Sequence, residues 1–480
     1  GVARPFRETG IGILDVFPIP GAKNPPRFDT NQERLMVRSR GQVGATAIAL
    51  DADAQVSNLV GVLDYFSGTW ALLPDAGSPP TVTGANTPTA VDIARYEDVT
   101  IGAFNLLRFF DEINDSNGAP TLQAAALDKR LTKTSLAICD FLRAPDILGV
   151  VEVENLRVLG LLADRINASC ARAPAYVRYL VPGHDVGGIN VGFLVSARSL
   201  GSVNRVDVVE VVQLGKDTLL TNPDASTSLL NDRPPLLLRA VVNQDNGATF
   251  PVTVIVNHLR SLNGIDDPSP GSSGWATDSE RVRAKRAQQA VFLADLVETR
   301  QQANPAERIV LIGDFNAFEF SDGYADVMGI IRGDEAAEPN VLTYAASPIT
   351  APLIDGSELI LDPAEAYSYV FAGSAQTLDH VIVNEQTVLD AADLAVDHAR
   401  INADFGVHNF GVAGNALRVS DHDPVRLAIS VGDFRSADLS ITAGATPATV
   451  AAGGTATFTA TIANAGPNKA SFPSVGLVFN

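Results

Sequence analysis

Acidic, amide and imidazole side chains follow short apolar runs at several places in this sequence, and together they could hydrolyse a phosphate ester. The clearest case is the run from Ile309 to Ile312, which ends in Gly313 and is followed by Asp314 and Asn316. Because side chains alternate along an extended chain, Asp314 and Asn316 lie on the same side. An acid that orients water, beside an amide that donates to an anionic oxygen, suits attack at phosphorus.

The same residues also fit a strand that ends in an Asx-turn, in which Asp and Asn side chains cap backbone N–H groups. The other apolar runs give weight to the chemical interpretation, because they also finish in polar groups. These groups are Asn105, Glu152, His258, Asp379, and Asp421 with His422. Strand ends of a packed sheet gather at one edge, so we expect these side chains to converge.

Glu152 is the best single candidate for a metal ligand. A hard divalent cation prefers a few oxygen ligands and retains waters, and Asn105 and Asp421 are the expected neighbours of Glu152. The competing interpretation is capping, since a predicted helix begins just after Glu152 and Glu154. The sequence contains no Cys–His cluster at zinc spacing, so a thiolate zinc site is not expected.

His422 needs a carboxylate partner from elsewhere in the chain, because alternation turns its neighbour Asp421 away. Asp379 could hold one ring nitrogen and leave the other to take a proton from water. The competing interpretation is a core histidine bonded to the backbone. Asp314 is a second candidate for the base, and the sequence does not separate it from His422.

Length and charge limit the function classes. The chain has 480 residues and a formal net charge of -20, and 46% of its residues are hydrophobic. This length predicts two or three globular domains. The acidic balance argues against a broad basic footprint for nucleic acid. It is still compatible with an enzyme that binds a polyanionic substrate at a small site containing a metal ion. No apolar run approaches the length of a membrane span.

Composition divides the chain into three parts. Residues 1–90 are predicted to form a β-rich accessory domain and linker, with β-like runs at 11–17, 35–37, 45–50 and 60–65. Residues 91–433 alternate strand-like and helical patterns and form the catalytic domain. Residues 434–480 alternate and end in a turn cluster, which predicts the start of a truncated immunoglobulin-like (Ig-like) β domain.

Within the middle part, periodicity predicts the elements that must position the polar groups. Strands are expected at 99–104, 146–151, 189–195, 236–242, 252–256, 309–312, 378–383 and 425–429. Helices are expected at 127–141, 155–166 and 279–300. Thr277 and Glu280 are spaced as a capping box for the last helix.

The two cysteines, Cys139 and Cys170, flank one predicted helix–strand–helix unit. One disulfide would fit an oxidising compartment, and two buried free thiols are the alternative. The chain begins with Gly1 and no signal peptide precedes it, so we expect a segment of a longer precursor.

Six motifs resemble, in their order, those of the endonuclease/exonuclease/phosphatase superfamily, and the chain is most similar to its secreted bacterial nucleases. They are FNLLRF at 104–109, VVEVEN at 150–155, VNHLRS at 256–261, IGDFNAF at 312–318, LDHVIV at 378–383 and SDHDP at 420–424. Each motif alone is weak, but the ordered set is specific. The resemblance implies an α/β, four-layer sandwich of two mostly antiparallel β-sheets flanked by helices, as in DNase I-like proteins.

The resemblance also implies roles. The implied catalytic residues are His258, Asp314, Asn316, Asp379 and His422. The implied ligands of Mg²⁺, with Mn²⁺ or Ca²⁺ as alternatives, are Glu152, Asn105 and Asp421. Residues 26–37 and 58–72 resemble the accessory domain of such nucleases. Residues 398–405 (HARINADF) resemble a loop near their site, which makes Asn402 a candidate substrate contact, with His398 and Asp404 nearby.

One departure concerns substrate binding. Many secreted nucleases carry a lysine shortly after the motif of His258, and here Leu262 follows Ser261. Arg260 or Arg281 could replace that lysine. The competing interpretation of the basic run at 281–286 is a solvated helix face.

The leading hypothesis is a secreted or cell-surface bacterial endonuclease that needs Mg²⁺ and takes nucleic acid, DNA before RNA, as its substrate. No obligate protein partner is expected. The first alternative is a phosphodiesterase or phosphatase for lipid or small-molecule phosphate esters. The second is a surface adhesion module without catalysis, which the intact set of polar residues argues against.

Overall fold

The computed structural model describes most of the chain. It covers residues 35–66, 69–115, 119–360, 365–431, 439–446 and 457–464, together with residues 25, 449, 451 and 453–455. The strand predicted at 11–17 and most of the resemblance at 26–37 lie outside the described residues. No helix in the described ranges is long and apolar enough to cross a membrane.

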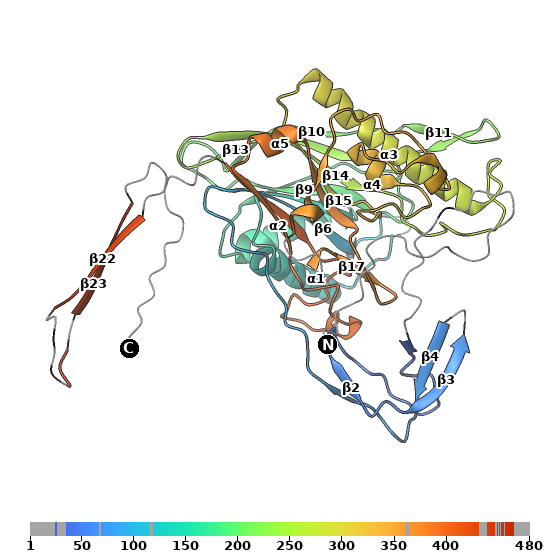
Figure 1. Cartoon of the computed structure of the whole chain (residues 1–480), viewed down its shortest axis with the longest axis horizontal. Coiled ribbons are helices and arrows are strands. Elements are labelled where there is room, and N and C mark those ends of the chain that lie inside the picture. Colours follow the sequence, from blue (N-terminus) through green and yellow to red (C-terminus); the bar gives the residue numbers. More distant parts are fainter. Residues whose placement is uncertain are drawn as a thin grey trace.

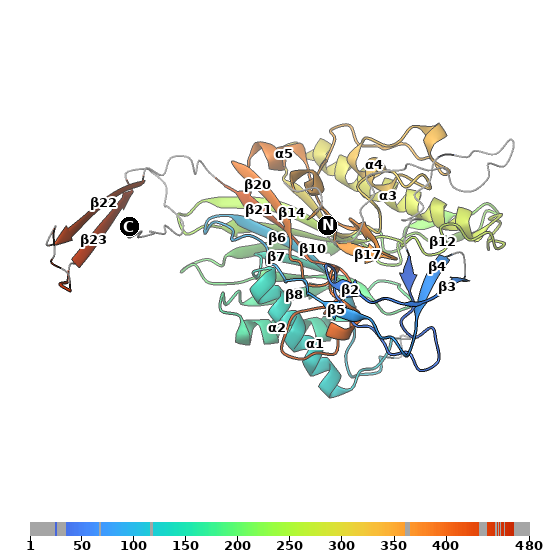
Figure 2. The same ribbon diagram turned by 60° about the horizontal axis from the view of Figure 1, so that its bottom comes forward.

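Two six-stranded sheets pack face to face and carry helices on their outer sides, as Figures 1 and 2 show. The first sheet has the order β20 (Asp393–His398), β21 (Val425–Ser430), β6 (Val99–Phe109), β7 (Ile147–Val153), β9 (Asn190–Ser196) and β8 (Tyr176–Leu180). The second has the order β10 (Val206–Gln213), β13 (Leu236–Asn243), β14 (Thr249–His258), β15 (Ile309–Asp314), β19 (Asp379–Val383) and β16 (Ile354–Asp355).

Each sheet is antiparallel except for one central parallel pair. These pairs are β6 with β7 and β14 with β15. In both, a polar site residue stands at or near the end of the strand, so the parallel arrangement brings those residues to the same edge. The predicted fold class, a sandwich of two mostly antiparallel sheets flanked by helices, is confirmed.

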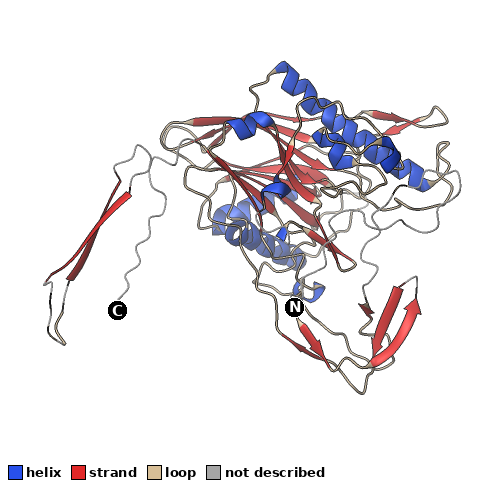
Figure 3. Ribbon diagram, viewed as in Figure 1, coloured by secondary structure: helices blue, strands red, loops and turns tan. Residues whose placement is uncertain are grey.

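Three apolar layers hold the sandwich together. The layer between the sheets is rich in β-branched residues, with Val151 and Val256 among those fully buried. Such residues pack well on a pleated surface. The outer layers lie between one sheet and helices α1 (Ala124–Leu136) and α2 (Leu156–Ser169), and between the other sheet and α3 (Asp278–Ala303) and α4 (Val327–Arg332). Figure 3 shows these helices on opposite outer sides.

Local sequence signals set the helix ends. The Asn155 side chain accepts a hydrogen bond from the N–H of Val158 at the start of α2. Thr277 accepts one from the N–H of Glu280 at the start of α3, as the predicted capping box requires. Helix α1 continues into one π-helical turn, Ala137–Phe141. A further short helix, α5 (Glu385–Leu389), follows β19.

Short strands outside the sandwich fill the rest of the described chain. The pairs and small sheets are β1 (Met36–Val37), β4 (Thr69–Pro74) and β3 (Gly61–Phe66); β2 (Gln55–Ser57) and β5 (Thr81–Thr83); β11 (Leu219–Thr221) and β12 (Thr227–Leu229); β17 (Tyr369–Phe371) and β18 (Ser374–Gln376); and β22 (Leu439–Thr446) and β23 (Thr457–Asn464). The strand predicted at 45–50 is wrong, because that segment has no ladder partner. The Ig-like assignment stays a prediction.

The predicted disulfide is not formed. Cys139 and Cys170 are free thiols. A hydrogen bond between the two side chains, together with burial, raises the pKa of Cys139. The alternative interpretation, two thiols packed on the apolar layer under α1 and α2, is therefore the one that the structure supports.

Gly149 sets how closely the two sheets approach each other. It lies in β7 and faces the second sheet, where an added Cβ would come within 2.6 Å of Ile312 Cδ1 and 3.0 Å of Val256 Cγ2. A side chain at this position would push the sheets apart three residues before Glu152.

We therefore expect Gly149→Val to lower the free energy of unfolding by about 1–3 kcal/mol, the usual cost of overpacking a core. Urea unfolding followed by circular dichroism measures the loss. Gly77→Val is the control, because no atom lies within 4 Å of a Cβ built at Gly77. Equal stability of the two variants would contradict the close sheet contact.

Candidate active site

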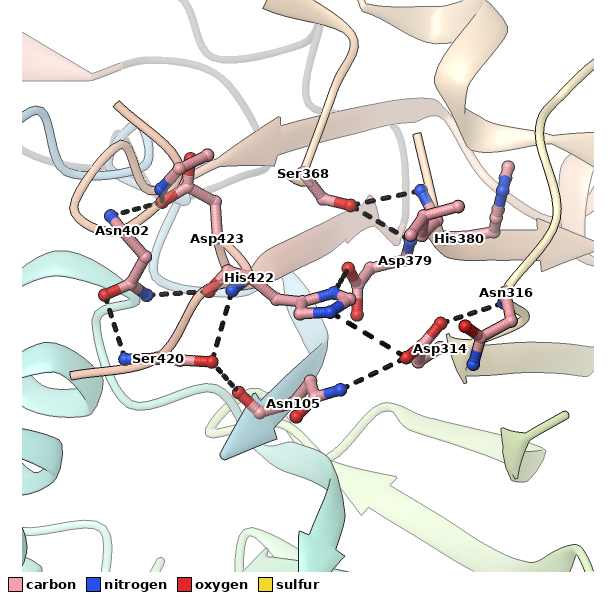
Figure 4. A network of polar contacts seen from close by, with 12 residues as sticks. Asn105, Asp314, Asn316, Ser368, Asp379, His380, Asn402, Ser420, His422 and Asp423 are labelled. Carbon is pink, nitrogen blue, oxygen red and sulfur yellow. Dashed lines mark hydrogen bonds and ion pairs between the residues drawn. The ribbon is translucent and has the colours of Figure 1, made fainter. Parts of the chain in front are cut away.

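The polar strand ends converge at one edge of the sandwich, between the two sheets (Figure 4). In the second sheet, His258 is in register with Asp314, and Asp314 with Asp379. The first sheet supplies Asn105 from β6, Glu152 from β7 and His422 from the loop before β21. Asn105 bridges the sheets: its Nδ2 donates to Asp314 Oδ2 at 3.1 Å and to Glu152 Oε1 at 3.3 Å.

His422 lies between two carboxylates. Its Nδ1 is 2.6 Å from Asp379 Oδ2, so the contact predicted between these two residues is present. Its Nε2 is 4.0 Å from Asp314 Oδ2. All three side chains are buried. The two atoms are too far apart for a hydrogen bond to each other, but close enough for one oxygen of a water or a phosphate to contact both.

The residues Ser368 and Tyr369 fix this pair in place. The Ser368 hydroxyl accepts hydrogen bonds from the N–H groups of Leu378 and Asp379, at 3.2 and 3.0 Å. The ring of Tyr369 stacks on the imidazole of His422, with centroids 4.6 Å apart. The remaining oxygen of Asp379, Oδ1, has no hydrogen-bond partner among the described residues.

Asp314 and Asn316 show both of the arrangements considered from the sequence. Asp314 Oδ1 accepts the N–H of Asn316 at 2.8 Å, which is an Asx-turn. At the same time Asp314 Oδ2 faces the site, where it meets Asn105 and lies 3.6 Å from His258 Nε2. The Nδ2 of Asn316 is bonded within the protein, because it donates to the carbonyl of Leu259 at 3.2 Å.

Burial and neighbouring charges together determine the protonation states of Asp314 and His422. Loss of water raises the pKa of Asp314 to about 7, and the charges of Asp379 and Glu152 add to that rise. Burial alone would lower the pKa of His422, but the carboxylates of Asp379 and Asp314 outweigh it and raise the pKa well above its usual value. The geometry therefore favours a positively charged imidazole beside a carboxyl group that titrates near neutral pH.

His258 has the opposite environment. Burial, followed by the positive charges of Arg233 and His422, lowers its pKa well below the usual value, so the ring is neutral. Its Nε2 lies 4.0 Å from Glu152 Oε1. Its Nδ1 is buried without a hydrogen-bond partner in the described part of the chain. A neutral imidazole at this place can donate one hydrogen bond without adding charge.

Glu152 is held in a strained backbone conformation. Its φ is 60°, and the ladder between β7 and its neighbours is interrupted around it. The N–H of Arg108 donates to Glu152 Oε2 at 2.8 Å. Residues held in sparsely populated φ/ψ regions are common at active sites. Oε1 faces Asn105 and His258, and the side chain keeps 18% of its surface open to solvent.

Among the described residues, one group of side chains is arranged so that it could hold a cation, and it is not the predicted set. Asp314, Asp379 and His422 have ligand atoms within 4.8 Å of one another. However, the short contact between Asp379 and His422 occupies one atom of each. The predicted set places Glu152 against Asn105, whereas Asp421 forms no hydrogen bond or ion pair with either in the described chain. Glu152 and Asp421 do share one neighbour, Arg130. Burial lowers the pKa of its guanidinium group, and the negative charges of the two carboxylates oppose that decrease.

Two of the three predicted substrate contacts, Arg260 and Arg281, lie near each other and near Arg233. Burial lowers the pKa of Arg260, and the charges of Arg281 and Arg233 lower it further, whereas the carboxylates of Asp232 and Asp278 raise it. The three guanidinium groups therefore form a basic cluster with acidic side chains among them. The Nη2 of Arg233 donates a hydrogen bond to the carbonyl of Leu259, the residue just before Arg260, at 2.9 Å. Arg281 is also paired with Asp278 at 2.7 Å, so its charge is partly neutralised.

The prediction that Asn402 contacts substrate is wrong. Its side chain is fully buried, with 0% exposed, and both ends of its amide are bonded to protein. Nδ2 donates to the carbonyl of His422 at 2.7 Å, and Oδ1 accepts the N–H of Ser420 at 3.3 Å. The motif that suggested Asn402 therefore marks a residue that supports the loop of His422.

A second buried histidine–carboxylate pair lies next to the site but does not belong to it. His380 Nδ1 is 2.8 Å from Asp355 Oδ2, and its Nε2 is 2.9 Å from the carbonyl of Ala317. Both ring nitrogens are thus used within the protein. His380 follows Asp379 on β19 and points to the other face of the sheet, so strand alternation separates it from His422.

Three residues near the chemistry were not selected from the sequence: Arg233, Ser368 and Tyr369. Arg233 stands before the pair Pro234-Pro235, just before β13, and a basic residue at a strand end was a usable signal. Ser368 and Tyr369 belong to a segment without clear periodicity, and no local signal marks them.

Solved structures of superfamily members match the chain, whereas no family model and no curated protein matches it. ANGEL2, a 2',3'-cyclic phosphatase, is 15% identical with a TM-score of 0.42 and covers 72% of this chain and 100% of its own. An endonuclease/exonuclease/phosphatase from Bacteroides vulgatus is 14% identical with a TM-score of 0.41, covering 70% and 99%. Truncated TDP2 from Caenorhabditis elegans is 14% identical with a TM-score of 0.40, covering 70% and 98%.

These identities and scores are low, so the fold class rests on the strand order and packing described above. The matched structures include members of the superfamily that the six sequence motifs resemble.

Proposed function

We propose that this protein is a metal-dependent phosphodiester hydrolase, and that its substrate is nucleic acid, with DNA preferred. The observation that carries the proposal is the array Asp379–His422–Asp314, in which a charged imidazole and a carboxyl group with a pKa of about 7 face each other across 4.0 Å. Groups whose pKa values are pushed apart in this way are suited to act as acid and base in one reaction.

In the proposed reaction, Asp314 accepts a proton from a water molecule while the oxygen of that water forms a bond to phosphorus. The bond from phosphorus to the leaving oxygen breaks, and His422 gives its Nε2 proton to that oxygen or stabilises the charge on it. Asp379 holds the imidazole through Nδ1 and favours its charged form. Neutral His258 can donate to a phosphate oxygen, whereas the Asn105 amide already donates to Asp314 and Glu152 and orients these two carboxylates.

The residues present fit a hard divalent cation. Glu152 offers a partly open carboxylate oxygen next to Asn105, and Asp379 Oδ1 is a buried carboxylate oxygen without a hydrogen bond. We propose that Glu152 holds Mg²⁺ with Asn105 and Asp421 nearby. The Asn105 amide would have to turn its oxygen toward the ion. The cation would supply Lewis-acid stabilisation of the phosphate.

The basic cluster Arg233, Arg260 and Arg281 supports a polymeric substrate. A small phosphate ester needs charge only at the reacting group, whereas a nucleic-acid strand places further phosphates beside it. These guanidinium groups lie on the side of His258 and can bind such a neighbouring phosphate. Each arginine of the cluster also has an acidic neighbour: Arg233 lies 3.8 Å from Asp185, Arg281 is paired with Asp278, and Asp232 lies near Arg260. Secretion by a bacterium is proposed on the sequence resemblance alone.

We expect the protein to cut plasmid DNA in Mg²⁺ and to lose that activity in EDTA. The assay compares plasmid DNA, RNA, sphingomyelin and a generic diester with Mg²⁺, Ca²⁺ or EDTA. Glu152→Gln should be inactive at low Mg²⁺, because it loses the charge that holds the cation. Glu210→Gln, which changes an exposed carboxylate paired with Arg239, is the control and should keep full activity.

Hydrolysis of sphingomyelin but of neither nucleic acid would replace the proposed substrate. No hydrolysis of any of the four would reject the enzyme and leave the adhesion module.

Asp314→Asn should lower the turnover rate by at least about 10²-fold while making the folded protein more stable at pH 8. The folded state holds the Asp314 proton up to about pH 7, whereas an unfolded carboxyl loses it near pH 3.8. Stability from this group is therefore lost as pH rises from about 4 to 7, and asparagine avoids that loss. Thermal unfolding in EDTA at pH 8 and at pH 4 measures the difference.

The gain in melting temperature should be present at pH 8 and vanish at pH 4. A variant that is less stable than wild type at both values would show that the pKa of Asp314 is not raised.

A further inference from the structure

The loop that carries His422 is built around a buried carboxylate that the proposed chemistry does not use. Asp423 Oδ1 accepts hydrogen bonds from the N–H groups of Ile401, Asn402 and Ala403, at 2.9, 2.7 and 3.3 Å. The N–H of Asp423 donates to the carbonyl of Ser368 at 2.7 Å. Asp423 is fully buried and makes no contact with the reacting groups. It fixes the residue next to His422 from two sides.

Arg400 neutralises Asp423 and extends the network. Its Nη1 donates to Asp423 Oδ2 at 3.1 Å and also to the carbonyl of Tyr367. Its guanidinium group lies 3.9 Å from the centroid of the Tyr367 ring, and its Nε donates to Glu365 at 3.1 Å. A buried carboxylate held by a buried guanidinium and three amides has little freedom to move.

The same frame connects the loop of His422 to strand β6 at the site. Asn402 donates to the carbonyl of His422 and accepts the N–H of Ser420. The Ser420 hydroxyl in turn donates to the carbonyl of Asn105 at 2.7 Å (Figure 4). Residues 400–404 therefore set the position of His422 relative to Asn105.

The chain before the sandwich clamps this frame from outside. Asp404 Oδ1 accepts the hydroxyl of Tyr367 at 2.7 Å, and its Oδ2 accepts Asn86 Nδ2 at 3.0 Å. Thr89 and Arg400 exchange two backbone hydrogen bonds, at 3.2 and 2.9 Å. Asp51 Oδ1 accepts the N–H of Gly406 and the Nδ2 of Asn409, both at 2.8 Å. The N–H of Ala52 also donates to the carbonyl of Asp404 at 2.8 Å. Residues 51–89 are therefore joined to the frame at Asp404 and Arg400, and to residues 406–409 just after it.

Polar contacts, rather than apolar packing, carry this attachment. A groove of about 560 Å³, open to solvent, separates residues 47–50 from the loop residues Gly406 to His408, with Val56 and Leu59 also lining it. Apolar side chains that do not fill the space between them contribute little to holding two segments in register. The hydrogen bonds of Asp51, Ala52, Asn86 and Thr89 are therefore the contacts by which this segment holds the loop.

We propose that the segment from Asp51 to Thr89, which precedes the catalytic sandwich, is a positioning element of the active site. It holds the frame of residues 400–404 and, through Asp423 and Asn402, sets the imidazole of His422. The inference rests on the proposed function, because it assigns the segment a role in that reaction. No residue of the segment is catalytic, since none touches the reacting groups.

The test uses the full-length chain with the double substitution Asp51→Ala and Asn86→Ala. We expect kcat on plasmid DNA to fall by about 10-fold or more, because small misplacements of a catalytic group cost up to about 10²-fold. KM should change by less than about 2-fold, because the basic cluster is untouched. Hydrogen–deuterium exchange should show faster exchange of the amides of residues 400–404 and 420–423.

Two further variants separate positioning from simple loss of stability. The single variant Asp51→Asn, which keeps Asn86, should have a kcat close to that of wild type, because the amide oxygen can still accept hydrogen bonds from both N–H groups. Gln42→Ala removes two hydrogen bonds, to the Leu73 carbonyl and to Asp75, inside the accessory part alone. It should change neither kcat nor exchange in the loop.

Unchanged kcat in the double variant despite faster exchange would overturn the positioning role, and unchanged exchange at 420–423 would break the link from segment to loop. If wild type hydrolyses no substrate, the proposed function fails instead, while exchange still reports whether segment and loop are linked.

Discussion

The contact between Asp379 and His422 is the interaction on which the rest of the site depends, because it joins the two sheets at the reactive edge. Asp379 opens β19 in the second sheet, and His422 stands just before β21 in the first. Their 2.6 Å separation fixes how the sheets meet there, and it places Nε2 of the imidazole opposite Asp314. A carboxylate that fixes one ring nitrogen determines what the other can do.

The charges and the backbone strain of the site lower the stability of the folded protein, and contacts in the surrounding structure offset that loss. Two buried carboxylates near one another are unfavourable unless a positive charge lies between them, and the imidazole provides that charge. The left-handed backbone at Glu152 adds strain. Against these costs stand three continuous apolar layers and a loop frame in which a guanidinium group and backbone amides satisfy the Asp423 carboxylate. The rigid scaffold allows an electrostatically unfavourable site to persist.

Much of this could be predicted from the sequence, and the exceptions have physical reasons. Apolar periodicity located the central strands, and alternation along them correctly excluded Asp421 as the partner of His422. The candidate substrate contact Asn402 came instead from the resemblance of residues 398–405 to a family loop, which does not tell on which face of the loop a side chain lies, and the residue is buried beneath the loop. Arg233 joins the site only through the packing of β13 beside β14. Long-range pairings such as Asn86 with Asp404, 318 positions apart, leave no local pattern.

The central claim is that Asp379 and His422 act as one unit in phosphodiester hydrolysis. The most direct measurement is the turnover rate on plasmid DNA of His422→Ala, Asp379→Asn and the double variant, each checked for folding by circular dichroism. We predict a fall of at least about 10²-fold for His422→Ala, a fall in the same direction for Asp379→Asn, and a double variant no slower than the poorer single one. Losses that multiply in the double variant, or full activity of His422→Ala, would contradict the account.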